Sequence, residues 1–465
     1  MTQTLTDRKR TLIFINILIS CIATSMLSTA LTTALPQIIP DLNIDVTTGQ
    51  WLTSGYSLAM GIMMPLTAFL ITRFPTRNLY LSAIGIFIAG SLICACSHGF
   101  AIMMFGRILQ ASGNGILTSM AQVVLLSIYP SEKRGTIMGW YGLSVGAAPV
   151  LAPALAGILI DTVGWRMIFH VATIIMIISL IYAIFVFGNV LETRTQAFDL
   201  ISFLISAIAF GGLTLGVGNI GSYGLFGLPC LLPLAGGIAS FILFVYRQLH
   251  LDDPFLEFRI LKYPVYTISV IGSMLLYFVM MGSSVILPLY VQSILGHPAT
   301  ISAFVSMPGS LVMTFVNPCA GKLYDRFGMK PLLFGGSIAM LLSNLAMTTV
   351  TMETSLILPA IYNMIRCASI GCLMMPLVTW GISGIDKRYT AHGTALLTSF
   401  RTIAGAMGAA IFVSIMTSVG KSSVSTYGAN AAIHGLNMTF LAMSLCTLIL
   451  VALSVIVKIK WKNTL

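Results

Sequence analysis

The chain is divided into fourteen long apolar segments, and the short gaps between them carry most of its charge. The segments fall at about 12–35, 49–71, 78–97, 101–128, 137–160, 166–189, 199–219, 225–246, 265–291, 299–321, 330–351, 355–381, 392–419 and 434–458. A bilayer core about 30 Å thick needs roughly 20 apolar residues per helix, so each segment is long enough to span it. Backbone groups in lipid must pair within their own segment, and strand-like alternation is absent, so the segments are expected to be helices.

The composition excludes a soluble globular protein. Hydrophobic residues make up 57% of the chain and charged residues only 8%, whereas soluble domains carry about 25% charged residues. We therefore expect an all-α integral membrane protein with 14 transmembrane helices. A membrane-embedded enzyme, or a sensor of similar shape, is a remote alternative, because the sequence has no motif for a clustered nucleophile, base or metal site.

The basic residues indicate how the chain is oriented in the membrane. Of the 24 Lys and Arg residues, Arg107, Arg366 and Arg401 lie inside apolar segments, and Arg166 and Lys421 lie in gaps on one side. The other 19 lie on the side that carries the N-terminus. Such a bias predicts an even number of helices, cytoplasmic termini and a multi-pass protein of the plasma (inner) membrane. The net charge of +11 follows from these loops, and no basic patch with interleaved aromatics indicates a nucleic-acid partner.

The chain also repeats itself at a nearly constant distance. Arg107 matches Arg366, 259 residues later, and Gly135 matches Gly393, 258 residues later. Two further landmarks, the Leu-Pro pairs at 35–36 and 287–288 and the loops at 71–77 and 324–330, recur at offsets of 252 and 253. Parallel repeats of this kind are a transporter architecture. They predict two pseudo-symmetric six-helix halves around an inserted helix pair, with boundaries at 1–198, 199–247 and 248–465.

Polar residues follow one face of segment 101–128. Five residues are spaced at helical intervals, which places them on one side of a helix: Arg107, Gln110, Asn114, Thr118 and Gln122. A charge in mid-membrane costs about 2.5–3.5 kcal/mol on insertion scales, so these residues should face a polar pathway for substrate or protons. The alternative is a static Arg held by helix-end carbonyls. Other pathway candidates inside segments, where plain packing is the alternative for each hydroxyl, are Ser25, Thr29, Thr32, Asn363, Arg366 and Arg401.

The acidic residues are informative by their positions. All 13 Asp and Glu lie in gaps or at segment ends, although a proton-coupled transporter usually needs a buried titratable group. His170 is one candidate for that group, with a packed His as the alternative. Gly420-Lys421-Ser422 resembles the end of a phosphate-binding loop, but Ile415 stands where its first glycine belongs. Energy should therefore come from a gradient, and neither a cofactor nor a metal is expected.

Together these motifs resemble the major facilitator superfamily, and within it the fourteen-helix drug:proton antiporter branch. The resemblance covers essentially the whole chain. The sequence GKLYDRFGMK at 321–330 matches the family's loop signature through Gly321, Asp325, Arg326 and Gly328. In the first-half copy at 71–77, Thr72 replaces the acid. The resemblance implies that Asp325 acts in a cytoplasmic latch between helices and that Thr72 cannot.

Other family motifs are shorter. Arg107 and Gln110 resemble an Arg-x-x-Gln motif that the family ties to proton handling. The family's antiporter motif is matched by Pro149, Pro153 and Gly157, and the start of the next segment by Trp165 and Arg166. Tyr56 matches the family in the second segment. One departure concerns the first segment, where the branch usually has an Asp eight or nine residues before Ala-Leu-Pro. Leu27 occupies that place here, so the resemblance implies a weakened preference for cations.

The sequence therefore predicts a secondary active multidrug efflux transporter that works by alternating access. The resemblance implies proton-coupled antiport, and three buried Arg without a buried carboxylate favour neutral or anionic amphipathic substrates. A dedicated exporter of one anionic metabolite or lipid-like acid is the alternative. The expected partners are small molecules and the lipid bilayer, and the chain is expected to act as a monomer.

Overall fold

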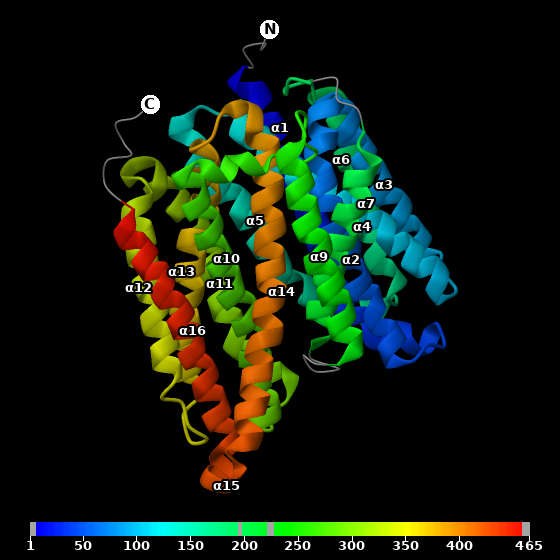
Figure 1. Ribbon diagram of the computed structural model, residues 1–465. Coiled ribbons are helices and arrows are strands. Elements are labelled where there is room, and N and C mark those ends of the chain that lie inside the picture. The colour runs from blue at the N-terminus through cyan, green and yellow to red at the C-terminus, as the bar shows by residue number, and fades with distance from the viewer. Residues whose placement is uncertain (1–5, 194–197, 221–226, 458–465) are drawn as a thin grey trace.

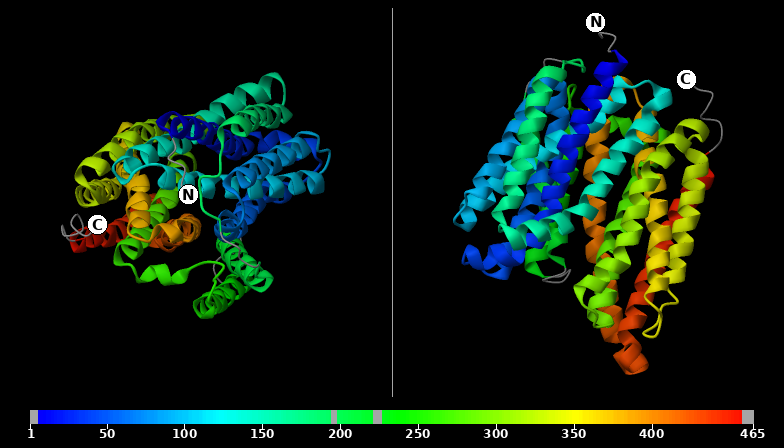
Figure 2. Two further views of the ribbon diagram at one scale, coloured as in Figure 1. Left: turned by 90° about the horizontal axis from the view of Figure 1, so that it is seen from above. Right: turned by 180° about the vertical axis from the view of Figure 1, so that it is seen from behind.

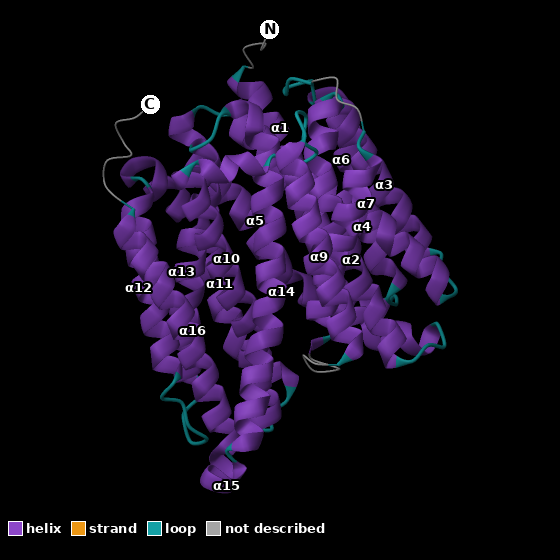
Figure 3. Cartoon of the chain, viewed as in Figure 1, coloured by secondary structure: helices purple, strands orange, loops and turns teal. Residues whose placement is uncertain are grey.

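The computed structural model describes residues 6–193, 198–220 and 227–457, and within helices α2, α5 and α11 the side chains of a few residues lie outside this description. Every regular element in these ranges is helical (Figure 3). The long helices are α1 (Asp7–Asp41), α2 (Val46–Arg73), α3 (Thr76–Ala95), α4 (Phe100–Ile128), α5 (Arg134–Thr162), α6 (Arg166–Val186), α7 (Leu200–Gly218), α9 (Leu228–His250), α10 (Pro264–Leu289), α11 (Ala299–Phe327), α12 (Met329–Met347), α13 (Ile357–Ser383), α14 (Thr390–Ser422) and α16 (Ala431–Ile456).

Short helical elements fill several of the gaps. They are η1 (Ser131–Lys133), η2 (Phe258–Lys262), the π-helical turn η3 (Tyr290–Ile294), η4 (Lys387–Tyr389), α15 (Val424–Tyr427) and η5 (Gly428–Asn430). Four gaps end in an acidic residue that accepts a backbone N–H of the following element: Asp45, Asp199, Glu257 and Asp386. These carboxylates satisfy donors that a helix cannot pair by itself. These four acidic residues therefore cap the N-terminus of the following helical element in addition to carrying charge.

The predicted all-helical membrane fold with fourteen spanning helices is confirmed. In the described part, 13 helical spans are long and apolar enough to cross a membrane, and α5 is the remaining long helix. The predicted segments agree with the helices to within several residues at most ends. Two differ more clearly: α1 begins at Asp7 and ends at Asp41, and α11 continues to Phe327. Charged side chains at these ends reach the membrane surface, so an apolar pattern understates helix length.

The helices form two groups that stand side by side (Figures 1 and 2). Helices α1–α6 pack with one another and are called the N-group; α10–α14 and α16 do the same and are called the C-group. Contacts between the groups run from α5 to α11 and from α2 to α14. Helices α7 and α9 pair with each other, and α7 contacts both α2 and α14. The division into halves at 198 and 247 stays a prediction.

The two ends of the bundle differ in which termini they carry. Helix α1 begins and α16 ends at the same end (Figure 1), as an even number of spans requires. We call this the terminus end and the opposite one the far end. Helix direction then places each residue: α5 runs from the terminus end to the far end, and α11 runs back.

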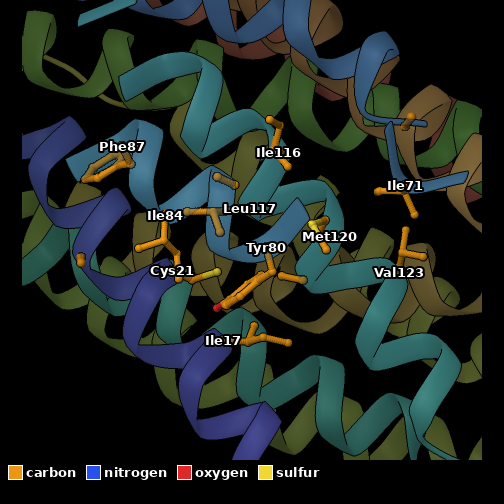
Figure 4. Close-up of a cluster of buried hydrophobic side chains, with 14 of the residues drawn as sticks. Ile17, Cys21, Ile71, Tyr80, Ile84, Phe87, Ile116, Leu117, Met120 and Val123 are labelled. Carbon is orange, nitrogen blue, oxygen red and sulfur yellow. The ribbon is translucent and has the colours of Figure 1, made fainter. Parts of the chain in front are cut away.

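The interior of the N-group is tightly packed. Figure 4 shows Ile17 and Cys21 of α1 facing Tyr80 of α3 and Leu117 of α4. The hydroxyls of Ser20 and Tyr80 are 2.8 Å apart, and the Tyr80 ring stacks on Phe187 with 4.0 Å between ring centroids. By contrast, large apolar side chains such as Phe185, which is 84% exposed, cover the outside of the bundle. An apolar outer surface around a packed interior suits a protein surrounded by lipid.

Candidate functional site

Arg107 of α4 is buried, and groups of α2 and of its own helix hold it directly. Its Nε donates to the carbonyl oxygen of Leu52 at 3.1 Å, and its Nη1 donates to Gln110 Oε1 at 2.7 Å. The Gln110 amide in turn donates to Ser91 Oγ of α3 at 2.9 Å. The guanidinium also lies over the Tyr56 ring, 4.0 Å from its centroid, where the ring face attracts a cation. The two residues of the predicted Arg-x-x-Gln motif, Arg107 and Gln110, are thus hydrogen-bonded to each other, and the Tyr56 ring packs against the guanidinium.

The polar face of α4 continues toward the terminus end. Asn114 Nδ2 donates to the Tyr56 hydroxyl at 2.8 Å, and Thr118 Oγ1 donates to Asn114 Oδ1 at 3.2 Å. Four predicted residues of one helix face and Tyr56 of α2 thus form one connected network. Such networks strengthen each bond in a low-dielectric interior.

Arg366 of α13 is buried inside the C-group with fewer partners. Its Nη2 donates to Asn363 Oδ1 at 2.7 Å, and its guanidinium lies 5.4 Å from the Phe440 ring centroid. Its Nε and Nη1 atoms have no hydrogen-bond partner among the described residues. Two of the predicted pathway residues, Asn363 and Arg366, are thus hydrogen-bonded to each other, but this cation has fewer partners than Arg107.

Arg401 of α14 lies near the contact between the two helix groups. It is 6% exposed, and its guanidinium is 4.9 Å from the Tyr277 ring centroid on α10. It also lies within electrostatic range of Tyr141 on α5. Its Nη1 has no hydrogen-bond partner among the described residues. Arg401 thus belongs to a C-group helix and lies within electrostatic range of an N-group residue.

The ion pairs between described residues all lie near helix ends or in gaps, and none includes Arg107, Arg366 or Arg401. The three membrane arginines therefore rely on amides, carbonyls and aromatic rings. An unpaired buried charge is costly, so their neighbourhood strongly favours negative charge and disfavours cations.

Asp325, near the end of α11, joins the two groups at the terminus end. Its Oδ1 accepts the backbone N–H of Gly135 at 2.8 Å, and its Oδ2 accepts the backbone N–H of Thr136 at 2.7 Å and the Thr136 hydroxyl at 2.6 Å. Gly135 and Thr136 begin α5, where unpaired N–H groups and the helix dipole favour an anion. Thr72, the counterpart of Asp325, instead donates to Ala68 of its own helix at 2.8 Å.

A row of glycines on α5 lets α11 approach closely beside Asp325. A Cβ on Gly139 would lie 2.6 Å from the Asn317 carbonyl oxygen, and one on Gly142 would lie 3.2 Å from the Asn317 side chain. Asn317 also donates to the Gly142 carbonyl oxygen at 3.3 Å. Gly321 of α11 meets Gly135 backbone to backbone. Small residues at helical spacing allow such close packing in membranes.

The same two helices are less close toward the far end. A Cβ on Gly146 would meet nothing nearer than 3.5 Å, and one on Gly157 would meet nothing within 4 Å. The far end of the N-group is instead tied within itself. Arg166 donates to Asp41 at 2.7 Å and to the Ser97 carbonyl oxygen at 3.0 Å, and Trp165 Nε1 donates to Asp41 at 3.1 Å. Trp165 and Arg166 thus bind the ends of α1 and α3 to the start of α6.

The hydroxyls predicted on α1 do not join the arginine networks. Thr29 donates to the Ser25 carbonyl oxygen at 3.2 Å, and Thr32 donates to the Thr29 carbonyl oxygen at 2.7 Å, so both serve their own helix. Leu27, at the position of the family's acid, lines an apolar pocket between α1, α5 and α6. A carboxylate there would lie among apolar side chains such as Ala156 and Ile168.

The remaining candidates are more scattered. His170 is exposed on α6, and no hydrogen bond or ion pair of the described part includes it. Pro149 and Pro153 lie in α5, but their side chains lie outside the described part. Gly328 ends α11 with a φ of 75°, which glycine adopts without strain, and the Arg326 guanidinium lies 5.0 Å from the Phe327 ring centroid.

Two sets of residues around the arginines and the α5–α11 contact were not predicted from the sequence. Gly139, Gly142 and Gly146 continue a helical row from Gly135, and that spacing is a signal that could have revealed the close contact with α11. Tyr141 and Tyr277 were missed because nothing in their local sequence separates them from other membrane tyrosines. Only the packing of α5, α10 and α14 brings them near Arg401.

Comparison with known proteins agrees with this arrangement. The family model for the Major Facilitator Superfamily matches residues 13–409. The MFS-type transporter YcnB of Bacillus subtilis is 34% identical over 409 residues, covering 88% of this chain and 87% of the relative. The lincomycin resistance protein LmrB of the same organism is 32% identical over 388 residues, covering 83% of this chain and 81% of its own.

A solved structure agrees with the fold. The proton:xylose symporter XylE matches with a TM-score of 0.65 at 14% identity, covering 96% of this chain and 97% of its own. The family and the fold are those of transporters and not of enzymes. The chain therefore belongs to the Major Facilitator Superfamily, resembles that family's drug-exporting members, and is a multi-pass membrane transporter.

Proposed function

We propose that the protein is a secondary active multidrug efflux transporter that works by alternating access and exchanges its substrate for protons. The observation that carries this proposal is the unequal contact between α5 and α11, which is tight at the terminus end and open toward the far end. With the termini in the cytoplasm, as the loop charges predict, this conformation is closed to the cytoplasm. The opposite conformation would require Asp325 to release Gly135 and Thr136.

The proposed transport cycle uses the N-group and the C-group as its two halves, with α7 and α9 as the inserted pair. Movement would occur about the central contacts from α5 to α11 and from α2 to α14. We infer that the Arg107 network modulates proton movement, because its bonds connect α2, α3 and α4. In this proposal the protein acts as a monomer in the plasma (inner) membrane.

The proposed substrates are amphipathic organic compounds that are neutral or anionic. The three membrane arginines support this class, because no described carboxylate forms an ion pair with them. The likeness to LmrB, whose name describes lincomycin resistance, supports export of an antibiotic-like compound. A cation near the arginines would be repelled, at an effective dielectric of 20, by about 4 kcal/mol at a separation of 4 Å.

The test is accumulation of substrate in proteoliposomes with an acidic lumen. Radiolabelled lincomycin and three amphipathic compounds of charge −1, 0 and +1 are supplied outside. We expect the neutral or anionic compounds to accumulate above their external concentration and to leave when a protonophore collapses the pH gradient. Accumulation no greater than in protein-free vesicles, for all four compounds, would refute the proposal.

A second candidate is a dedicated exporter of one anionic metabolite or lipid-like acid. The unpartnered nitrogen atoms of Arg366 and Arg401 favour it, because they suit a single acidic group. Competition separates the two functions. Inhibition of transport by many unrelated compounds supports a multidrug exporter, whereas inhibition by one chemical class supports the dedicated one.

A further inference from the structure

Arg401 has an unusual position among the membrane arginines. It lies eleven residues after the start of α14, or about 16 Å along the helix, near the middle of the membrane. Arg107 is surrounded by acceptors, and Arg366 is fully buried within the C-group. Arg401 is instead buried in a helix that contacts α2 and α4 of the N-group. It is therefore the membrane cation best placed to meet a substrate between the groups.

The described groups around Arg401 are aromatic rings and neutral polar side chains. Arg401 Nη1 has no partner, and the Tyr277 ring is its described aromatic contact. Across the contact, Tyr141 of α5 lies within electrostatic range of Arg401 and beside Gln122 of α4. The amide nitrogen and oxygen of the buried Gln122 have no partner that meets the distance and angle of a hydrogen bond. The hydroxyl of Thr398, one turn before Arg401, also has no such partner. Several buried polar groups here thus lack partners at once.

Buried polar atoms without partners indicate a missing ligand or water. An anion suits this place better than a neutral group, because Arg401 supplies a positive charge and no described carboxylate forms an ion pair with it. The Gln122 amide and the Tyr141 hydroxyl can donate additional hydrogen bonds. A cation would meet an uncompensated like charge.

We propose that Gln122, Tyr141, Tyr277 and Arg401, which we call the Arg401 site, bind the acidic group of an amphipathic anion during transport. This inference rests on the proposed function and specifies its substrate class. Tyr141 lies between Gly139 and Gly142 in α5, so the site lies at the level of the close contact with α11. Separation of α5 and α11 would expose it to the terminus end, and closure would shield it from that side.

The test compares two dyes that share one apolar body. The anion 1-anilinonaphthalene-8-sulfonate and the neutral N-phenyl-1-naphthylamine differ by the sulfonate, and both become fluorescent on binding. Binding is measured in lipid nanodiscs, with empty nanodiscs subtracted. We expect the wild-type chain to bind the anion at least tenfold more tightly than the neutral dye.

Substitutions locate the binding. Arg401→Gln should raise the Kd of the anion at least tenfold and change the Kd of the neutral dye less than twofold, and Arg401→Lys should restore part of the affinity for the anion. Lys421→Gln removes a charge from the exposed far end of the same helix and should change neither. Tyr141→Phe, which keeps the ring and loses one donor, should raise the Kd of the anion severalfold and gives a milder test if Arg401→Gln fails to fold.

The outcomes separate this inference from the proposed function. Equal losses for both dyes in Arg401→Gln, no change for either dye, or no wild-type preference for the anion would overturn the Arg401 site. Pumping of the neutral dye without binding of the anion would overturn the site and leave proton-coupled export intact. Selective binding of the anion at Arg401 without movement along a pH gradient would support the site and refute the proposed transport.

Discussion

At the scale of single residues, the two matched arginines of the repeat have different surroundings. Gln110 accepts a hydrogen bond from Arg107. The residue 259 positions after Gln110 is Ser369, whose hydroxyl donates to the Ile365 carbonyl oxygen of its own helix at 2.9 Å. Arg366 therefore depends on Asn363, three residues earlier, for its described hydrogen bond. The two matched positions therefore share the charge and not its hydrogen-bond partners, so Arg107 and Arg366 need not have the same role.

Tyr56 makes two separable contributions to the Arg107 network. Tyr56→Phe removes the hydroxyl that accepts from Asn114 and keeps the ring under Arg107. We expect it to cost about 1 kcal/mol of stability. Tyr56→Leu should cost a further 0.5–2 kcal/mol or so, because the contact between cation and ring is lost as well. Thermal unfolding of the purified protein in one detergent measures both, and equal costs for the two variants would contradict the ring's role.

At the scale of helices, the contact between α5 and α11 depends on the absence of side chains. Gly139 leaves room for the backbone of Asn317, and the Asp325 carboxylate fits against the first N–H groups of α5. Direct backbone contact makes this junction sensitive to a single methyl group.

Gly139→Ala should therefore weaken closure of the terminus end, because its Cβ would lie 2.6 Å from a backbone oxygen that cannot rotate away. Spin labels at the exposed positions Glu132 and Lys322 report the separation by electron–electron distance measurement. We expect longer distances in the variant. Gly335→Ala is the matched control, since a Cβ there meets nothing within 4 Å, and unchanged distances in Gly139→Ala would argue against a tight junction.

Asp199 joins α7 to α9 at the terminus end. It accepts hydrogen bonds from Ser202 at the start of α7 and from Arg247 near the end of α9. Partial burial by itself raises the pKa of Asp199, but hydrogen bonds from Ser202 and then Arg247 outweigh it and hold the pKa below its ordinary value. Because the folded pKa is lowered, this stabilisation is complete above the unfolded pKa of about 3.9 and is lost as pH falls through the folded pKa.

Asp199→Asn should accordingly speed amide hydrogen exchange at the start of α7 at pH 7. The difference from wild type should disappear at a pH below the folded pKa, once exchange is corrected for its intrinsic pH dependence. Asp7→Asn, which changes an exposed carboxylate paired within α1, should leave α7 unaffected at every pH. A difference that persists in acid would mean that the carboxylate charge is not what stabilises this helix start.

At the scale of the whole molecule, the conformation depends on a few contacts at one end. Asp325 accepts three hydrogen bonds across the groups, whereas its first-half counterpart Thr72 bonds within its own helix. In the proposed transport cycle, a single latch of this kind would make the equilibrium between conformations depend on one contact between the N-group and the C-group. The latch is therefore the part of the molecule at which the balance should shift most easily.

Asp325→Ala should shift that balance away from the closed terminus end. Loss of hydrogen bonds to a charged acceptor costs about 1.5–3 kcal/mol, which corresponds to roughly a ten- to hundredfold lower ratio of closed to open molecules. The spin-label pair at Glu132 and Lys322 measures this ratio. Asp325→Asn should lie between wild type and Asp325→Ala, because an amide keeps one acceptor, and a wild-type distribution in Asp325→Ala would contradict the latch.

The sequence was enough to predict the membrane fold and the face of α4, because both depend on local patterns. Long apolar runs must become helices in lipid, and helical spacing places Arg107, Gln110, Asn114 and Thr118 on one side. Tyr56 entered only through a family resemblance. The hydroxyls of Ser25, Thr29 and Thr32 could not be assigned, because a hydroxyl in a membrane helix can serve its own backbone or a neighbour equally well, and Thr29 and Thr32 serve their own helix.

The number and order of the spans, the position of three arginines inside them and the family resemblance could all be read from the residues alone. These follow from hydropathy and short motifs, which act within one helix or one loop. Only packing between distant helices shows which arginine is well paired, that Asp325 holds the start of α5, and that Tyr141 lies beside Gln122 and within electrostatic range of Arg401. The physical reason is that these contacts join helices far apart in the chain, where only packing between the two groups sets the distances.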